Sequence, residues 1–153
     1  MPGEASLPIQ YYPDDFGDLN INFPLASAIP DPCAVFFAED RASVIDSVIL
    51  YTVSNTQSGA TIALRVSTNP TNTTANPVCT LDIGTANNSR LYVSTDKNPF
   101  TVSSTGVVGT SATSTRINSN ENTIPAGSYL ILDPSTTVTW RGFIQIRMRT
   151  RQK

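Results

Sequence analysis

The sequence predicts an all-β protein, a β-sandwich or jelly roll built as a single domain with an extended N-terminal arm. Short runs of β-branched and aromatic residues alternate with turns rich in Asn, Gly, Asp and Pro. No stretch has the apolar spacing of a convincing amphipathic helix. Only 14% of the 153 residues are charged, and Ser, Thr and Asn take the place of the missing charges. We expect roughly eight to ten short strands, the number typical of a sandwich or jelly roll.

Residues 1–32 differ from the rest and define the arm, while 33–153 form the predicted sandwich. Prolines interrupt residues 1–32 repeatedly, and each one fixes its own φ and removes a backbone donor. Large apolar residues lie between them, which a disordered tail would lack. The segment therefore needs a surface to lie on, either a partner or its own domain as an extra strand. The candidate partner-binding residues are Ile9, Tyr11, Tyr12, Phe16, Phe23 and Leu25.

From Cys33 onward the pattern is strand, turn, strand. Residues 33–38 are a short apolar run, and residues 43–53 are rich in β-branched side chains, although their first turn could be helical. Residues 60–68 alternate, with the apolar positions on one face. These positions are Ile62, Leu64 and Val66.

The middle of the chain predicts shorter strands. Residues 69–77 are a loop by composition, and residues 78–84 alternate as a strand does. Three further candidates are separated by turn residues: 90–94, 100–104 and 114–118. Pro125 and Gly127 suit the second and fourth positions of a type I turn, which leads into another strand.

The last stretch, TVTWRGFIQIRMRTR (137–151), alternates with period two over its whole length. Its even positions are mostly apolar and include Trp140, a predicted core anchor; Gly142 is a predicted bulge. Its odd positions carry arginines and an aromatic, the residue types enriched where proteins meet. We therefore predict a final strand with an oligomer interface at Arg141, Phe143, Arg147 and Arg149.

Charge is segregated along the chain. Acidic residues dominate the first third and basic residues the end, so the tail of one copy could dock on the acidic arm of another, or both could be solvated. The net charge of −2 argues against generic nucleic-acid binding, and the alternation of the tail argues against a flexible basic arm. We predict no nucleic-acid partner.

The chain lacks the residues on which most catalysis depends. Histidine is absent, which excludes Ser-His-Asp and Cys-His nucleophiles and the commonest zinc ligand. Asp82 and Asp133 could form a glycosidase pair, and residues 14–20 could collect calcium, but neither pattern is specific. We predict a protein that is not an enzyme and has no catalytic residues, cofactor or metal.

Cysteine usage and hydropathy bear on the compartment. No apolar run reaches the length of a membrane span, and the first ten residues have no basic or apolar signal-peptide region. We predict synthesis in a host cytoplasm, no membrane partner, and two unpaired thiols at Cys33 and Cys79.

Taken together, the chain resembles the head decoration (cement) proteins of tailed bacteriophages. The proline-punctuated arm, the Ser/Thr/Asn-rich loops and the closing IPAGSYLIL…VTWRGFIQIRMR hairpin carry this resemblance across the whole chain. It implies a structural β-sandwich that binds the major capsid protein on the capsid surface of a virion, often as a homotrimer. The alternative is a tail, neck or fibre adaptor, or a module that binds a host glycan; a sandwich with hydrolase activity comes third.

Overall fold

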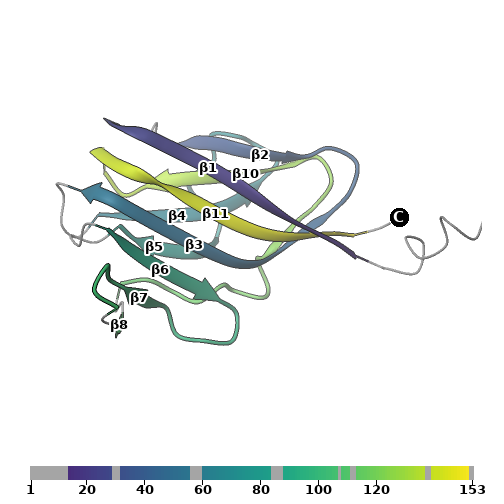
Figure 1. Cartoon of the computed structure of the whole chain (residues 1–153). Helices are drawn as coiled ribbons and strands as arrows, with labels where there is room; N and C mark the ends of the chain where they lie inside the picture. Colours follow the sequence, from purple (N-terminus) through teal and green to yellow (C-terminus); the bar gives the residue numbers. More distant parts are fainter. Residues whose placement is uncertain are drawn as a thin grey trace, which may run out of the picture.

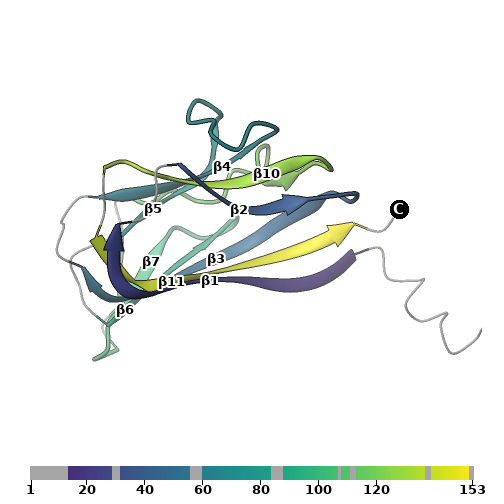
Figure 2. The ribbon, with the colours of Figure 1, turned by 90° about the horizontal axis from the view of Figure 1, so that it is seen from above.

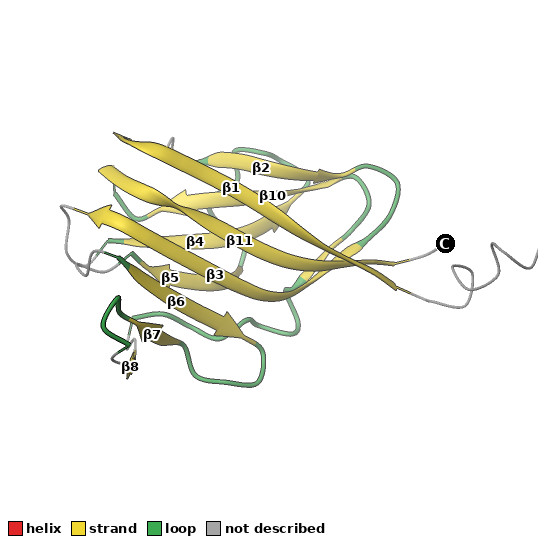
Figure 3. Cartoon of the chain, viewed as in Figure 1, coloured by secondary structure: helices red, strands yellow, loops and turns green. Residues whose placement is uncertain are grey.

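The computed structural model describes residues 14–28, 32–55, 60–83, 88–106, 108–110, 113–136 and 139–151. Within these ranges the secondary structure consists of strands without a helix, arranged in two antiparallel sheets (Figures 1 and 3). Seen from above, the sheets form two layers (Figure 2), and one apolar core fills the space between them. The predicted β-sandwich is confirmed, while jelly-roll connectivity stays a prediction.

The seven-stranded sheet has the order β1-β11-β3-β6-β7-β8, and β9 also pairs with β3. Its strands are β1 (Asp14–Ala28), β3 (Ser43–Asn55), β6 (Ser89–Ser94), β7 (Phe100–Val102), β8 (Val108–Thr110), β9 (Thr123–Ile124) and β11 (Thr139–Arg151). The four-stranded sheet has the order β2-β10-β4-β5. Its strands are β2 (Cys33–Ala38), β4 (Thr61–Ser67), β5 (Pro77–Asp82) and β10 (Ser128–Pro134).

Part of the expected arm lies in the seven-stranded sheet. Residues 14–28 form β1, which pairs antiparallel with β11 at the edge of the sheet (Figure 1). Residues 14–28 therefore lie on their own domain as an extra strand, which is one of the two alternatives that the sequence left open for the arm. The register places Asp14 opposite Arg151 and Asp18 opposite Arg147. The acidic start and the basic end of the chain therefore lie side by side within one molecule.

The apolar core is crossed by a polar link between the two sheets. Trp140 on β11 is fully buried, as its place on the apolar face of the strand predicted. Its indole N–H donates to the hydroxyl oxygen of Thr52 on β3 at 3.1 Å. That hydroxyl donates in turn to the carbonyl of Ile83, which follows β5, at 3.3 Å. The link satisfies polar groups that would be costly to bury unpaired.

Strand β3 contains two bulges opposite β11. Asp46 of β3 has no residue opposite it in the register, because Arg147 and Met148 of β11 lie opposite its two neighbours. Val53 of β3 is the extra residue of the second bulge, opposite the step from Arg141 to Gly142 on β11. The predicted bulge at Gly142 is therefore present, but the extra residue is on β3. Gly142 is required there, because a Cβ atom would overlap the Tyr51 carbonyl oxygen and lie 2.5 Å from the Trp140 ring.

Residues 114–118 were predicted as a strand, and the structure corrects this. The segment is irregular, and it closes the side of the sandwich between β5 and β6. The Thr115 and Asn118 N–H groups donate to carbonyls of β5, while the Ile117 N–H donates to the Ser94 carbonyl of β6. A chain that bonds alternately to two sheets cannot keep the register of either one.

The turn before β10 also differs from its prediction. The Ser128 N–H donates to the Pro125 carbonyl at 3.0 Å, so the turn runs from Pro125 to Ser128. Gly127 therefore occupies the third position rather than the fourth, with φ at +80°. A type II turn requires a positive φ at that position, which explains why glycine is there.

Candidate functional site

The outer face of β11 carries the predicted interface residues together. Trp140, Gly142, Ile144, Ile146 and Met148 are buried, as the even positions of the alternation predicted. The odd positions form what we call the arginine row: Arg141, Phe143, Gln145, Arg147 and Arg149. Arg141 and Arg147 are exposed and the other three are half-buried. The predicted placement of these side chains on one non-core face is confirmed, while their role in an oligomer stays a prediction.

An aromatic ladder crosses this face at right angles to the strands. The rings of Tyr51 on β3 and Phe143 on β11 are stacked, with centroids 4.0 Å apart and planes 16° apart. The guanidinium of Arg90 on β6 lies over the other side of the Tyr51 ring, 5.2 Å from its centroid. Such stacking and cation–π contacts favour a fixed side-chain arrangement over a mobile one.

Arg90 is held by its neighbours although it is exposed. A side-chain hydrogen bond with Tyr92 is the main reason that its pKa is raised above the ordinary value, and the nearby Tyr51 also contributes. Tyr92 in turn stacks on Phe100 of β7, with ring centroids 5.0 Å apart. The outer face of the seven-stranded sheet therefore carries four aromatic rings and fixed cations, where the rest of the described surface is rich in Ser, Thr and Asn.

The first bulge places an anion on the same face. The Nε–H of Arg149 donates to both carboxylate oxygens of Asp46, at 2.9 and 3.0 Å. A partly exposed ion pair of this kind contributes at most about 1 kcal/mol to stability. Its effect is to fix Arg149 on the face, at the far end of the row from Phe143.

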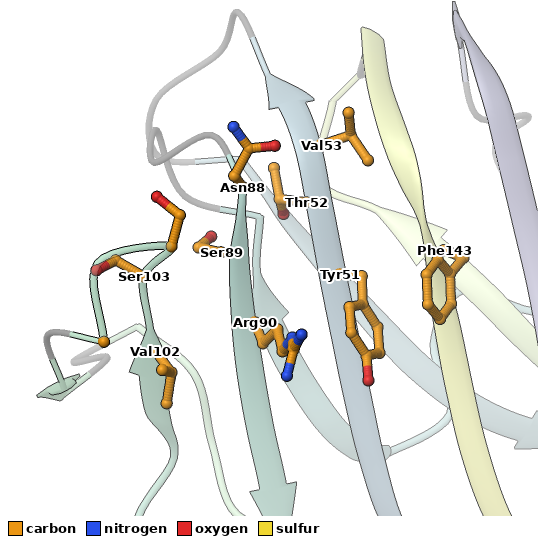
Figure 4. A pocket seen from close by; sticks show the side chains of 11 residues that line it. Tyr51, Thr52, Val53, Asn88, Ser89, Arg90, Val102, Ser103 and Phe143 are labelled. Carbon is orange, nitrogen blue, oxygen red and sulfur yellow. The ribbon is translucent and has the colours of Figure 1, made fainter.

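A pocket of about 570 Å³ opens at one end of the face, between β11, β3, β6 and the turn after β7 (Figure 4). Its apolar lining is formed by Tyr51, Val53, Val102 and Phe143, and its polar lining by Thr52, Asn88, Ser89, Arg90, Ser103 and Ser104, with Gly106 beside them. The second bulge helps to form it, because Val53 is the extra residue of β3 and is 40% exposed.

Backbone geometry fixes the rim of this pocket. Asn88 has φ at +54°, a conformation that Asn tolerates better than most residues. Its N–H donates to the carbonyl of the bulged Val53 at 3.4 Å. On the opposite rim, the hydroxyls of Ser103 and Thr105 lie 2.9 Å apart. The first rim is therefore tied to β3, and the second is held by a hydrogen bond within its own turn.

The four-stranded sheet has a different outer face. Phe37 of β2 and Tyr129 of β10 lie 4.7 Å apart between ring centroids, and Phe37 is 45% exposed. Asp133 of β10 is paired with Arg65 of β4 at 2.6 Å, and Arg65 also donates to the Ala75 carbonyl. This face has one small aromatic contact and a neutralised charge pair.

The two carboxylates considered for catalysis have separate structural partners. Asp133 is held by Arg65, and Asp82 on β5 accepts a hydrogen bond from the Thr113 hydroxyl at 2.5 Å. Within the described ranges, no group of three or more His, Cys, Asp or Glu side chains is placed to hold a metal ion. The predicted calcium ligands in residues 14–20 lie on β1, whose side chains are not described.

Both cysteines are free, as predicted. Cys79 is buried in the core, and burial raises the pKa of its thiol to about 12. The thiol therefore stays protonated at neutral pH and is a poor nucleophile. Cys33 is half-buried at the start of β2.

The predicted partner-binding residues fall in two groups. Ile9, Tyr11 and Tyr12 lie outside the described residues. Phe16, Phe23 and Leu25 lie on β1, where Phe16 is opposite Arg149 and Phe23 is opposite Gly142 in the register. Their side chains are likewise outside the described part of the structure, so their role as partner contacts stays a prediction.

The sequence did not identify Tyr51, Arg90, Tyr92 or Phe100 as members of the candidate site. Arg90 and Tyr92 are two residues apart on a predicted strand, which places them on one face. What the sequence does not show is that this strand lies beside residues 43–53, opposite Tyr51 in the register.

Comparisons with known proteins assign no family to this chain. No protein-family model, no curated protein and no solved structure matches the chain. No helix in the described ranges is long and apolar enough to cross a membrane.

Proposed function

We propose that this protein is a non-enzymatic structural component of a virion, which binds the outer surface of a bacteriophage capsid. The proposal combines the resemblance of the sequence to phage decoration proteins with a compact two-sheet sandwich. Its partners are the major capsid protein and further copies of itself. It is synthesised in the host cytoplasm and acts on the capsid surface, without a cofactor, nucleic acid or membrane.

The observation that carries the proposal is the outer face of the seven-stranded sheet. Two aromatic stacks and the arginine row lie on this face. Aromatic residues and arginine are enriched in protein interfaces, whereas a solvated sheet face is dominated by small polar residues and lysine. We therefore assign this face to the contact between copies of the chain, with Arg141, Phe143, Arg147 and Arg149 in it.

Together with the resemblance to decoration proteins, the assignment predicts a homotrimer in solution. Sedimentation of the purified protein at micromolar concentration should give three times the chain mass of 16.4 kDa. Arg141→Glu, which reverses an exposed charge of the arginine row, should shift the protein towards monomer, because a reversed charge in an interface core is costly. Arg41→Glu, in the exposed turn after β2, is the matched control and should leave the trimer intact.

A monomeric wild-type protein would contradict the oligomer. An equal effect of both charge reversals would contradict the location of the interface, because Arg41 lies off the face. Since both arginines are exposed, neither change should unfold the chain, but loss of the subunit contact should lower the melting temperature of Arg141→Glu while that of Arg41→Glu stays unchanged.

The segment before β1 supplies the proposed capsid contact. Ile9, Tyr11 and Tyr12 are apolar anchors in the sequence, and an aromatic side chain buries about 150–250 Å² at a contact. Deleting residues 2–13 leaves β1 itself complete. The truncated protein should remain a folded trimer but lose binding to purified capsids that lack the protein, measured by co-sedimentation. Full binding after the deletion would place the capsid contact elsewhere.

An adaptor of the tail, neck or fibre is an alternative position in the virion for the same binding protein. Copy number on purified particles separates the two, because a decoration protein is present in many copies on the capsid and an adaptor in few.

The pocket favours glycan binding as a second candidate function. A glycan site needs an exposed aromatic ring, and Trp140, the single tryptophan of the chain, is buried. Tyr51 and Phe143 instead supply aromatic rings at the edge of a pocket with several hydroxyl and amide groups. A pocket of this size and mixed lining is a common form of small-ligand site.

A further inference from the structure

The pocket at the end of the aromatic ladder has a definite chemical character. Its described lining contains one cation, Arg90, and no carboxylate. Arg90 is positioned by the Tyr51 ring, whose centroid lies 5.2 Å from the guanidinium carbon. A guanidinium that is already fixed loses little conformational entropy when it binds an anion.

The other polar groups suit a ligand with many hydroxyls. Asn88, Ser89, Ser103 and Ser104 also line the pocket, and Figure 4 shows Asn88, Ser89 and Ser103 towards one end of it and Arg90 towards the other. Hydroxyl and amide side chains both donate and accept hydrogen bonds, so they can pair with sugar hydroxyls in either sense. Phe143, Val53 and Val102 offer apolar surface to the C–H groups of a sugar ring.

The number of charges limits the ligand further. A phosphate or a nucleotide carries more negative charge than one arginine can balance, and such sites usually add a helix N-terminus or clustered backbone N–H groups. A single carboxylate matches a single guanidinium, and the two can pair through parallel hydrogen bonds. The volume of about 570 Å³ leaves room for a sugar ring and part of its neighbour.

We propose that this pocket binds a sugar that carries a carboxylate, such as a uronic acid in an acidic polysaccharide, with Arg90 as the carboxylate ligand. The inference rests on the second candidate function and specifies its ligand class; it does not depend on capsid attachment. Phe143 belongs both to the pocket and to the proposed subunit contact, so the pocket lies at the rim of that contact.

The test is a titration of the full-length protein with D-galacturonate and with galactose, followed by NMR chemical-shift changes. We expect galacturonate to bind at least ten times more tightly than galactose, with shifts concentrated at residues of the pocket. Arg90→Gln should weaken galacturonate binding at least tenfold, and Arg90→Lys should weaken it less. Arg41→Gln is the matched control and should bind as the wild type does.

Several outcomes would overturn the proposal. These are no binding of either sugar, equal binding of both, and galacturonate binding that survives Arg90→Gln. Tighter binding of a nucleoside monophosphate than of galacturonate would also overturn it, because the pocket would then belong to a different ligand class. Arg90 is exposed, so a melting curve should show Arg90→Gln to be as stable as the wild type. Failure here leaves the trimer and the capsid contact unaffected, since sedimentation measures those separately.

Discussion

Gly142→Ala is expected to lower the free energy of unfolding by about 3–5 kcal/mol, enough to reduce the melting temperature by roughly 10 °C in a domain of this size. A Cβ atom at this position overlaps the backbone carbonyl of Tyr51 and meets the buried ring of Trp140. The backbone cannot yield without breaking the β3–β11 register, and the ring cannot yield without leaving Thr52. Thermal and urea unfolding followed by circular dichroism measure the effect.

Gly127→Ala is the matched control for this change. Gly127 has φ at +80° but no atom within 4 Å of the added Cβ, so only conformational strain of about 1–2 kcal/mol is expected. If the two variants were equally stable, steric overlap at Gly142 could not be the cause. If Gly142→Ala were as stable as the wild type, the close approach of β3 to β11 would be wrong.

Deletion of residues 2–28 is expected to have the second large effect. It removes β1 and leaves one edge of β11 without a partner along most of its length. An exposed, long edge strand promotes association between chains. We expect a fall in melting temperature of at least about 10 °C and soluble aggregates in size-exclusion chromatography.

Deletion of residues 2–13 is the control for that experiment, because it retains β1. It should melt close to the wild-type temperature. An unchanged melting temperature after the longer deletion would show that β1 contributes little to the sandwich, and that residues 14–28 are available as an attachment arm as the sequence first suggested.

The alternation of β11 could be predicted from the sequence because one face of the strand is buried and the other is not. The even positions from Trp140 to Met148 are buried, and the odd positions carry the polar row. The bulges of β3 were harder to predict, although the one at Asp46 interrupts the alternation of buried residues along the strand. Ile45, Val48 and Leu50 are all fully or almost fully buried, and the spacing of three between the first two marks the extra residue at Asp46.

The segment 114–118 was predicted wrongly for a related reason. Its Thr and Ile suit a strand, and propensity describes how a residue fits a pleated surface. Propensity does not show whether the strands that hydrogen-bond to the segment belong to one sheet or to two. The segment bonds to β5 and to β6, which lie in different sheets, and that information is tertiary.

Only part of the candidate site could be predicted from the sequence, because the sequence does not show which strands are neighbours. The arginine row lies along one strand, so its members share a face by period two alone. The aromatic ladder and the pocket run across β11, β3, β6 and β7, and they depend on which strands are neighbours. Tyr51, Arg90 and Phe143 are far apart in sequence, so their stacking follows from register and not from local pattern.

The position of β11 between β1 and β3 has a consequence for the order of events during synthesis. β11 is the last of the described strands to leave the ribosome, yet it is an interior strand of its sheet. Until it emerges, β1 and β3 have no common neighbour, and the nascent chain must hold both without pairing them. Folding of the sheet is therefore limited by the pairing of residues far apart along the chain, which is slow in β-proteins.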